Sequence, residues 1–324
     1  MKLLVTSSPH IHSGTHTSRL MGAVLVALLP ALLAGVWFFG LRSLALVGVT
    51  VLSCLLSEWG YRKLTRQSNT LPDLSAAVTG VLLAMTLPAT APYWLAAVGG
   101  VFAIVVVKGL IGGLGQNIFN PALAARALLV LLWPSWMVRY APAGTKPDPL
   151  ALSVDMVASA TPLHHMQMPA LPTESLPDVF LGNMGGCIGE VSALALLLGG
   201  GYLLARKVIS WRIPAAYLGT VALLTLIFSK GQNPVLWMLY SLMSGGVLVG
   251  AFFMATDYAT SPATPRAQLL YGLGCGVLTV VFRYYGLFPE GVTYAILLMN
   301  ACAWSLDRLM PPKRFGTVKG GAAQ

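Results

Sequence analysis

A short segment that ends in a threonine brings an acid and hydroxyl side chains close together. It reads Asp155-Met-Val-Ala-Ser159-Ala160-Thr161, and a proline and a leucine follow it. Its carboxylate and two hydroxyls offer hydrogen-bonding groups. Small residues and a proline are also typical of an ordinary ordered turn. Taken by itself, the segment favours the turn and does not define a site.

A glycine-rich segment, residues 112–121, carries a second group of polar side chains. It reads Gly-Gly-Leu-Gly-Gln-Asn-Ile-Phe-Asn-Pro and contains Asn117 and Asn120. Their amides both donate and accept hydrogen bonds, which suits an uncharged heterocycle better than an ion pair. Non-helical backbone at membrane depth is tolerated only where it is buried or lines a cavity. The alternative is that these asparagines cap helix ends.

Acids in apolar surroundings form a third group of candidates. Asp257 lies between Thr256 and Tyr258, where a helix is expected to break, and it is the acid best suited to ion coupling. A structural hydrogen-bonding role is its alternative. Residues 182–190 could place backbone N–H groups around an anion, or simply form a turn. The four cysteines form no CxxC pair, so no metal or iron–sulfur site is expected.

The composition places these candidates in a membrane protein. Hydrophobic types make up 56% of the 324 residues and charged types 9%, against roughly a quarter charged in ordinary soluble domains. Because lipid-facing side chains should be apolar, a bilayer explains this balance. We expect an all-α integral membrane protein with about ten spans of about 20 residues. The expected spans are 20–40, 43–60, 74–90, 92–110, 121–138, 188–205, 213–229, 234–254, 267–283 and 290–306.

The basic residues set the expected direction of the spans. If the N-terminus is cytoplasmic, most of the 20 Lys and Arg residues, Lys108 and Arg126 among them, fall on the cytoplasmic side. This is the bias of the positive-inside rule. The exceptions are Arg42, Arg139, Lys146, Lys230 and Arg283. Both termini are then cytoplasmic in a bacterial inner membrane, and the long proline-rich loop 139–187 is periplasmic.

This loop divides the chain into two halves with weak internal similarity. The expected parts are an N-terminal segment 1–19, a first membrane half 20–138, the loop 139–187, a second membrane half 188–306 and a tail 307–324. The third span ends in Met85-Thr-Leu-Pro88, and the eighth ends in Met254-Ala-Thr-Asp257. An odd number of spans per half would give two inverted five-helix repeats with broken helices. The alternative is that membrane helix ends simply reuse Gly, Pro and Thr.

Over nearly its whole length the chain resembles the D subunits of Rnf electron-transport complexes, which are related to the B subunits of sodium-pumping NADH:quinone reductases. The likeness includes the glycine-rich segment 112–121 and residues 182–190. Further matching segments are Ser7-Ser-Pro-His10, Thr17-Ser-Arg19, Ala255-Thr-Asp257 and Pro289-Glu-Gly-Val292.

The resemblance implies a covalent flavin on the loop. In that family the motif Asp-x-x-Ser/Thr-x-Ala-Thr carries FMN as a phosphoester on its final threonine, which corresponds to Thr161. Asp155 and Ala160 are also retained. Ala158 stands where the family usually has Ser or Thr, and Ser159 occupies a position often held by Gly. The acceptor hydroxyl itself is present.

The resemblance also implies the function. A second, noncovalent flavin (riboflavin) is expected among the helices, with Asn117 and Asn120 as contacts. The chain would relay electrons between ferredoxin and NAD branches through both flavins, coupled to Na⁺ or H⁺ movement, and would not catalyse alone. Its partners would be the iron–sulfur and periplasmic flavoprotein membrane subunits, the cytoplasmic ferredoxin and NAD subunits, a periplasmic flavin transferase and the lipid bilayer.

Two other functions stay open. The broken helices and the possible repeat would also suit a transporter or channel without a redox role. The quinone-reducing relative, the B subunit of a sodium-pumping reductase, is the third possibility. The Asp155–Thr161 segment separates the first alternative from the redox proteins, since a solute channel needs no modified threonine.

Overall fold

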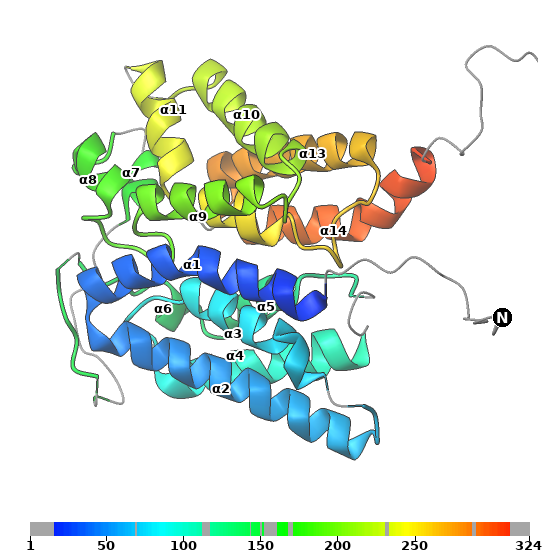
Figure 1. Ribbon diagram of the computed structural model, residues 1–324. Coiled ribbons are helices and arrows are strands. Elements are labelled where there is room, and N and C mark those ends of the chain that lie inside the picture. The colour runs from blue at the N-terminus through cyan, green and yellow to red at the C-terminus, as the bar shows by residue number, and fades with distance from the viewer. Residues whose placement is uncertain are drawn as a thin grey trace, which may run out of the picture.

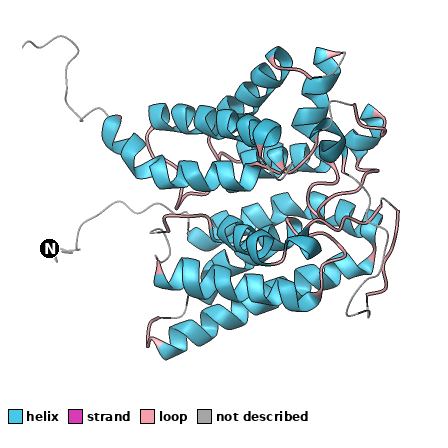
Figure 2. Cartoon of the chain, turned by 180° about the vertical axis from the view of Figure 1, so that it is seen from behind, coloured by secondary structure: helices cyan, strands magenta, loops and turns pink. Residues whose placement is uncertain are grey.

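In the residues that it describes, the computed structural model of the chain is all-α, with turns and loops between the helices. The described residues are 16–68, 70–111, 117–142, 144–149, 151, 161–167, 171–230, 233–286 and 290–311. Within them, the only extended pairing is one isolated bridge between Pro88 and Cys187. Figures 1 and 2 show two stacked groups of helices, one from each half of the chain.

The first group comes from the N-terminal half. It comprises α1 (Thr17–Phe39), α2 (Leu41–Leu64), the short η1 (Leu71–Asp73), α3 (Ser75–Met85), α4 (Tyr93–Val101), the π-helical η2 (Phe102–Leu110), α5 (Pro121–Leu132) and α6 (Pro134–Met137). Helix α2 packs along α3 and α4, and α5 packs against η2 and α3. Gly40, at φ +75°, lies between α1 and α2 in the left-handed region that favours glycine.

The second group contains the loop helices and the C-terminal half. It comprises α7 (Pro162–Gln167), α8 (Leu176–Leu181), α9 (Ala193–Ala205), α10 (Arg212–Ile227), α11 (Pro234–Met243), α12 (Val247–Val249), the π-helical η3 (Gly250–Met254), α13 (Pro265–Tyr285) and α14 (Val292–Leu309). Helix α13 packs along α10 and α14. The chain bends by 62° between α11 and α12–η3, where Gly245 and Gly246 both have positive φ.

The helices agree with the predicted spans in position but not always in length. Each expected span range contains a helix in the described residues. Four helices are long and apolar enough to cross a membrane (α1, α2, α4 with η2, and α13), and the bent pair α11 with α12–η3 would be a fifth. Helices α3, α5, α9 and α10 are apolar but shorter. The all-α membrane class is confirmed, while ten spans and an inverted repeat stay predictions.

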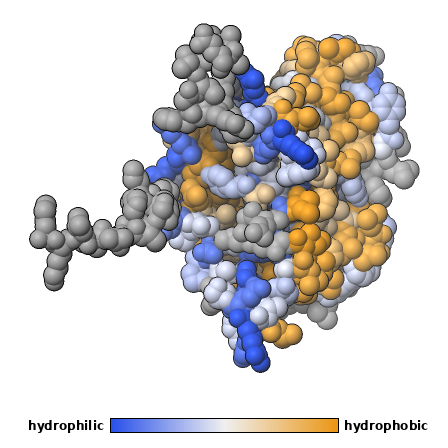
Figure 3. All heavy atoms as spheres, turned by 90° about the vertical axis from the view of Figure 1, so that its right-hand side faces the viewer, coloured by the Kyte–Doolittle hydropathy of each residue, from blue (hydrophilic) through white to orange (hydrophobic). Residues whose placement is uncertain are grey.

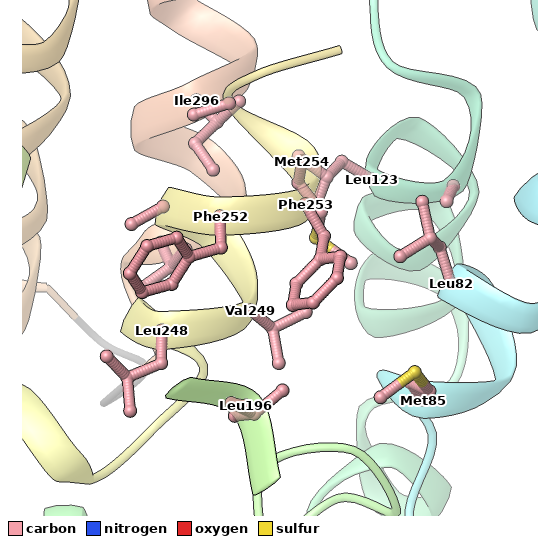
Figure 4. Close-up of a cluster of buried hydrophobic side chains, with 14 of the residues drawn as sticks. Leu82, Met85, Leu123, Leu196, Leu248, Val249, Phe252, Phe253, Met254 and Ile296 are labelled. Atoms are coloured by element: carbon pink, nitrogen blue, oxygen red, sulfur yellow. The ribbon is translucent and has the colours of Figure 1, made fainter. Parts of the chain in front are cut away.

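Apolar side chains fill the space between the two groups. Helix α1 packs along α9, and α5 packs against α14. In Figure 4, Phe253 of η3 lies between the two groups, with Leu82 and Leu123 on one side and Leu248 on the other. Helix α3 is buried over nearly its whole length, so it forms the centre of this core.

The outer surface carries large apolar side chains. Figure 3 shows a broad hydrophobic face on one side of the molecule. Exposed members of this class are Leu33, Trp37, Leu131, Leu198, Ile227 and Trp304. Such exposure suits side chains that face lipid or neighbouring membrane proteins.

The seam between α1 and α9 gives a first test. A Cβ on Gly199 would lie 2.1 Å from the carbonyl oxygen of Ala27, so the Gly199→Ala variant must separate the two helices. We expect its free energy of unfolding to fall by about 1–3 kcal/mol, measured by thermal unfolding in detergent.

The matched control for this seam lies in the same helix. Around a Cβ on Gly201, nothing lies within 4 Å, so Gly201→Ala should leave the stability unchanged or slightly higher. Equal losses in the two variants would show that the close approach of α1 and α9 is not what the first substitution disturbs.

Candidate functional site

Described residues of the first part of the loop 139–187 lie against one end of the first helix group. Arg42, which is fully buried, donates hydrogen bonds to the carbonyl oxygens of Ala89 and Ala91 from Nε and Nη2, and from Nη1 to that of Asp148. Tyr93 donates to the carbonyl oxygen of Pro149. The predicted non-cytoplasmic residue Arg42 therefore does lie on the loop side, where it fixes the loop to α2.

Thr161 lies immediately before α7 and is 8% exposed. Its Oγ1 accepts a hydrogen bond from the backbone N–H of His164 at 3.3 Å. Leu163 sits against Gly245, because a Cβ on that glycine would lie 2.5 Å from its Cδ2. The loop threonine is thus anchored to the break between α11 and α12. The predicted residues Asp155, Ser159 and Ala160 lie outside the described residues.

A cavity of about 320 Å³ lies at the other end of α1. The N-terminal turns of α1, from Thr17 to Val24, line it, whereas the loop contacts the C-terminal end at Gly40 through Lys146. The 23 residues of α1 separate the two ends by roughly 35 Å at 1.5 Å per residue. The other walls of the cavity come from α3, η2, the start of α5, α9, η3 and the residues just after η3.

The cavity is largely apolar with a few polar groups. Val78, Leu82, Phe252 and Phe253 contribute apolar walls. The polar side chains that line it are Thr17, Ser75, Thr79, Lys108, Asn117, Asn120, Thr256, Asp257 and Tyr258. Concave, mainly apolar sites with few polar groups are typical of small-molecule and cofactor pockets.

Three residues predicted separately from the sequence meet in this cavity: Asn117, Asn120 and Asp257. Asn120 caps α5, since its Oδ1 accepts from the N–H groups of Ala122 and Leu123 at 3.0 and 3.3 Å. This is the capping role that the sequence left open as an alternative. The carboxylate of Asp257 accepts a hydrogen bond from the hydroxyl of Thr260, at 3.3 Å.

Asn120 also connects the two halves of the protein. Its Nδ2 donates to the carbonyl oxygen of Met254 at the end of η3, at 3.4 Å. Asn117 is nearly buried in the cavity wall. Both asparagines therefore belong to the cavity wall, and Asn120 also holds α5 to the end of η3.

Sequence reasoning missed a buried charge cluster on the loop side of this cavity. Arg126 of α5 forms ion pairs with Glu190, at 3.5 Å, and with Glu290. Tyr140 donates a hydrogen bond of 2.7 Å to Glu290, and Cys187 lies within 3.7 Å of the guanidinium. Two carboxylates and one guanidinium therefore share an interior site.

Two of the basic residues counted as cytoplasmic signals are buried in ion pairs instead. Arg126 is 4% exposed inside the charge cluster, and Lys108 pairs with Glu58 at 2.6 Å. Their burial leaves the predicted side of the membrane untested, but it shows that they are not surface charges, because desolvated charges are retained inside a protein when they are paired. The hint in the sequence was the presence of acids and bases within apolar spans, but their partners are far apart in the chain.

The segment 182–190 proves to be structural at its C-terminal end. The N–H groups of Ile188 and Gly189 donate to the carbonyl oxygens of Leu87 and Met85, at 3.0 and 2.8 Å. These donors complete the C-terminal end of α3, whose last carbonyls have no partner within the helix. They are therefore not available for an anion, and the turn alternative describes this part of the segment.

Apolar helices, a bent helix pair and buried polar groups define a multi-span membrane protein, and comparison with known proteins identifies its family. The chain belongs to the NQR2, RnfD, RnfE family, which it matches over residues 4–316. The predicted resemblance is confirmed.

Its relatives include proteins that match it over nearly their full length. It is 48% identical to the D subunit of the Na(+)-translocating ferredoxin:NAD(+) oxidoreductase complex of Acetobacterium woodii, over 98% of this chain and 97% of the relative. It is 39% identical to the D subunit of the proton-translocating ferredoxin:NAD(+) oxidoreductase complex of Clostridium ljungdahlii, over 97% and 96%. It is 36% identical to the D subunit of the ion-translocating oxidoreductase complex of Halorhodospira halophila, over 98% and 97%.

The charge cluster gives a second test. Arg126→Met would leave Glu190 and Glu290 buried without their guanidinium. Breaking a buried ion pair from one side costs about 3–5 kcal/mol, so we expect a fall of this size in the free energy of unfolding, followed by thermal unfolding in detergent. Arg308→Met removes an exposed arginine of α14 and should cost about 1 kcal/mol or less. Similar stability in both variants would contradict a structural role for the cluster.

Proposed function

We propose that this chain is the flavin-bearing membrane subunit of an Rnf-type ferredoxin:NAD oxidoreductase. It relays electrons within the complex through FMN on Thr161 and a second flavin in the cavity, and it does not catalyse alone. The observation that carries the proposal is a buried loop threonine beside a separate cavity. Leu163, two residues after Thr161, contacts Gly245, and the chain continues from there to Phe252 and Phe253 in the cavity wall. A carrier at each site would give electrons a path between the loop and the cavity.

Thr161 fits the attachment of a phosphoester. Its hydroxyl belongs to the loop, and the backbone N–H of His164 already points at its oxygen. Phosphate oxygens are strong acceptors for such a donor. The flavin would supply one- and two-electron chemistry once attached, while the protein supplies placement and electrostatics. Asp155, Ser159 and Ala160 complete the proposed motif.

The cavity fits a noncovalent heterocycle such as riboflavin. Its volume of about 320 Å³ is at the lower end of the roughly 300–1,000 Å³ of small-molecule sites. Apolar walls suit a planar ring system, and the amide of Asn117 can donate and accept hydrogen bonds at its edge. Lys108 and Asp257 add one positive and one negative charge to the lining.

The proposed orientation has both termini in the cytoplasm of a bacterial cell and the loop 139–187 in the periplasm. Two of the few basic residues on the loop side, Arg42 and Arg283, are buried and bonded to backbone carbonyls. Few positive charges then remain at the loop surface. The bias required by the positive-inside rule therefore holds even without Lys108 and Arg126 on the opposite side.

We also propose that the two helix groups form an inverted repeat of ten spans. The first helices of the two halves pack together (α1 with α9), and so do the last (α5 with α14), as expected when equivalent elements meet at a two-fold axis. Thr86 after α3 and Thr256 after η3 are both buried. Each donates to a carbonyl of its own helix, Leu83 or Phe252. The matching ends support a correspondence between α3 and η3.

The proposed partners and coupling follow from the family. The relatives' names describe parts of multi-subunit complexes, so the other Rnf subunits would act with this chain. A flavin transferase is the further proposed partner, because FMN must be attached to Thr161. One relative is named for sodium and the other for protons. Sequence identity to these relatives therefore leaves both ions as candidates. Asp257, which lines the cavity, is the proposed coupling residue.

The covalent flavin is tested by Thr161→Ala, co-expressed with a flavin transferase. Wild-type protein should fluoresce under ultraviolet light after denaturing electrophoresis, and the variant band should be dark because the acceptor hydroxyl is gone. Thr173→Ala, an exposed loop threonine, is the matched control and should stay fluorescent. A dark wild-type band beside an active transferase would favour a transporter without a redox role.

The second flavin is tested by filling the cavity. Val78→Trp adds a large ring to the cavity wall, so acid-extractable flavin should be lost while the fluorescent covalent band remains. Val98→Trp, on an exposed face of α4, is the matched control and should retain both flavins. Normal extractable flavin in the first variant would place the second flavin outside this cavity.

A further inference from the structure

A buried ion pair separates the cavity from a second, smaller recess. Lys108 of η2 lines both spaces. The recess has a volume of about 50 Å³. Its lining includes Glu58, the half-buried Arg62 and the exposed Gln67, so it opens toward solvent. The pair Glu58–Lys108 therefore lies between this solvent-facing recess and the cavity.

The contacts of this pair are short. The Nζ of Lys108 lies 2.6 Å from Oε1 of Glu58 and 2.7 Å from Oγ of Ser75. Ser75 lines the cavity from the start of α3. Thr70 donates a hydrogen bond of 2.6 Å to the same carboxylate oxygen. An unbroken series of exchangeable protons thus runs from the recess to the cavity.

One oxygen of the Glu58 carboxylate makes no contact that a purely structural ion pair would need. Glu58 is 2% exposed, and its Oε2 has no hydrogen-bond partner within the part of the chain that the structure describes. A buried polar atom without a partner costs about 1–3 kcal/mol, and a structural pair repays its desolvation only when the remaining lone pairs are satisfied. A carboxyl that takes up and gives away a proton gives this oxygen a role.

The choice of lysine at position 108 and its place in η2 also support a role in proton transfer. Lysine changes its protonation state readily when it is buried, whereas arginine keeps its proton. The charge cluster, which holds parts of the fold together, uses Arg126, while the cavity wall uses Lys108. Lys108 also belongs to the π-helical η2, and π-helical turns are frequent at functional sites.

We propose that Glu58, Lys108 and Ser75 form a proton path from the recess to the heterocycle in the cavity, an inference that rests on the proposed function. For each electron that arrives from a one-electron carrier of the complex, Lys108 gives one proton to a ring nitrogen, directly or through the Ser75 hydroxyl. A proton from water in the recess then adds to the Glu58 carboxylate. Glu58 passes this proton to the amine of Lys108, which restores the ion pair. One electron and one proton enter together, and the charge of the cavity is unchanged.

Other polar groups surround this path and belong to its electrostatics. Cys54, Tyr61 and Arg62 of α2 lie beside the pair. Thr70 contacts the carboxylate, and Asp257 lines the cavity that receives the proton. Of these groups, Arg62 is the positive charge at the recess.

The test uses the purified complex with Glu58→Gln, which keeps the size and the acceptor for Thr70 but cannot carry a proton. Acid-extractable flavin should match the wild type. Reduction of that flavin, followed in a stopped-flow instrument, and proton uptake, followed with a pH-indicator dye, should both slow by about 10²-fold or more. Glu58→Asp should recover much of both rates. Asp73→Asn, a carboxylate change in nearby η1, is the matched control and should behave as the wild type.

The outcomes separate the path from the cavity assignment. Wild-type rates in Glu58→Gln with a full flavin content would overturn the path alone. A wild-type complex without acid-extractable flavin would overturn the cavity assignment and the path with it. If Glu58→Gln does not assemble, Lys108→Arg decides, because arginine keeps the positive charge but does not give up its proton. Slow proton uptake in Lys108→Arg would support the path, and wild-type uptake would overturn it.

Discussion

The fold depends on one constraint: every charged side chain and every backbone polar group buried away from water needs a partner. Arg126 of α5 holds Glu190, which follows the loop, and Glu290, which precedes α14. Three chain segments that are distant in sequence therefore meet at one guanidinium. Because isolated buried charges are costly, none of the three segments can move away without leaving a charge exposed to apolar surroundings.

The same constraint explains how the short helices can end inside the protein. The carbonyl of Met85 receives the N–H of Gly189, and that of Met254 receives the amide of Asn120. Arg283 donates to the carbonyls of Ser241 and Ser244, beside the bend after α11. Helix ends at membrane depth need such partners. The broken helices are thus held by side chains and backbone from the opposite half or, at the bend after α11, from α13 of the same half.

The sequence was informative wherever the signal is local. Apolar runs located the helices, and the glycine and asparagine segment 112–121 pointed to a cavity that Asn117 does line. It could not show that Arg126 faces Glu290, because pairing across more than a hundred residues depends on tertiary packing. Nor could it distinguish Lys108 as a topology signal from Lys108 as the partner of Glu58. Helices such as α3 are shorter than their apolar runs suggest, since flanking residues form turns.

The close approach of α1 and α9 has a consequence for motion. At Gly199 the two backbones touch without an intervening side chain, so sliding of one helix along the other would drive neighbouring side chains into backbone. Rotation about the line of contact would keep the two backbones at this spacing. Any relative movement of the two halves would therefore be a rocking about the seam, and its cost would fall where α5 meets α14, on the ion pair between Arg126 and Glu290.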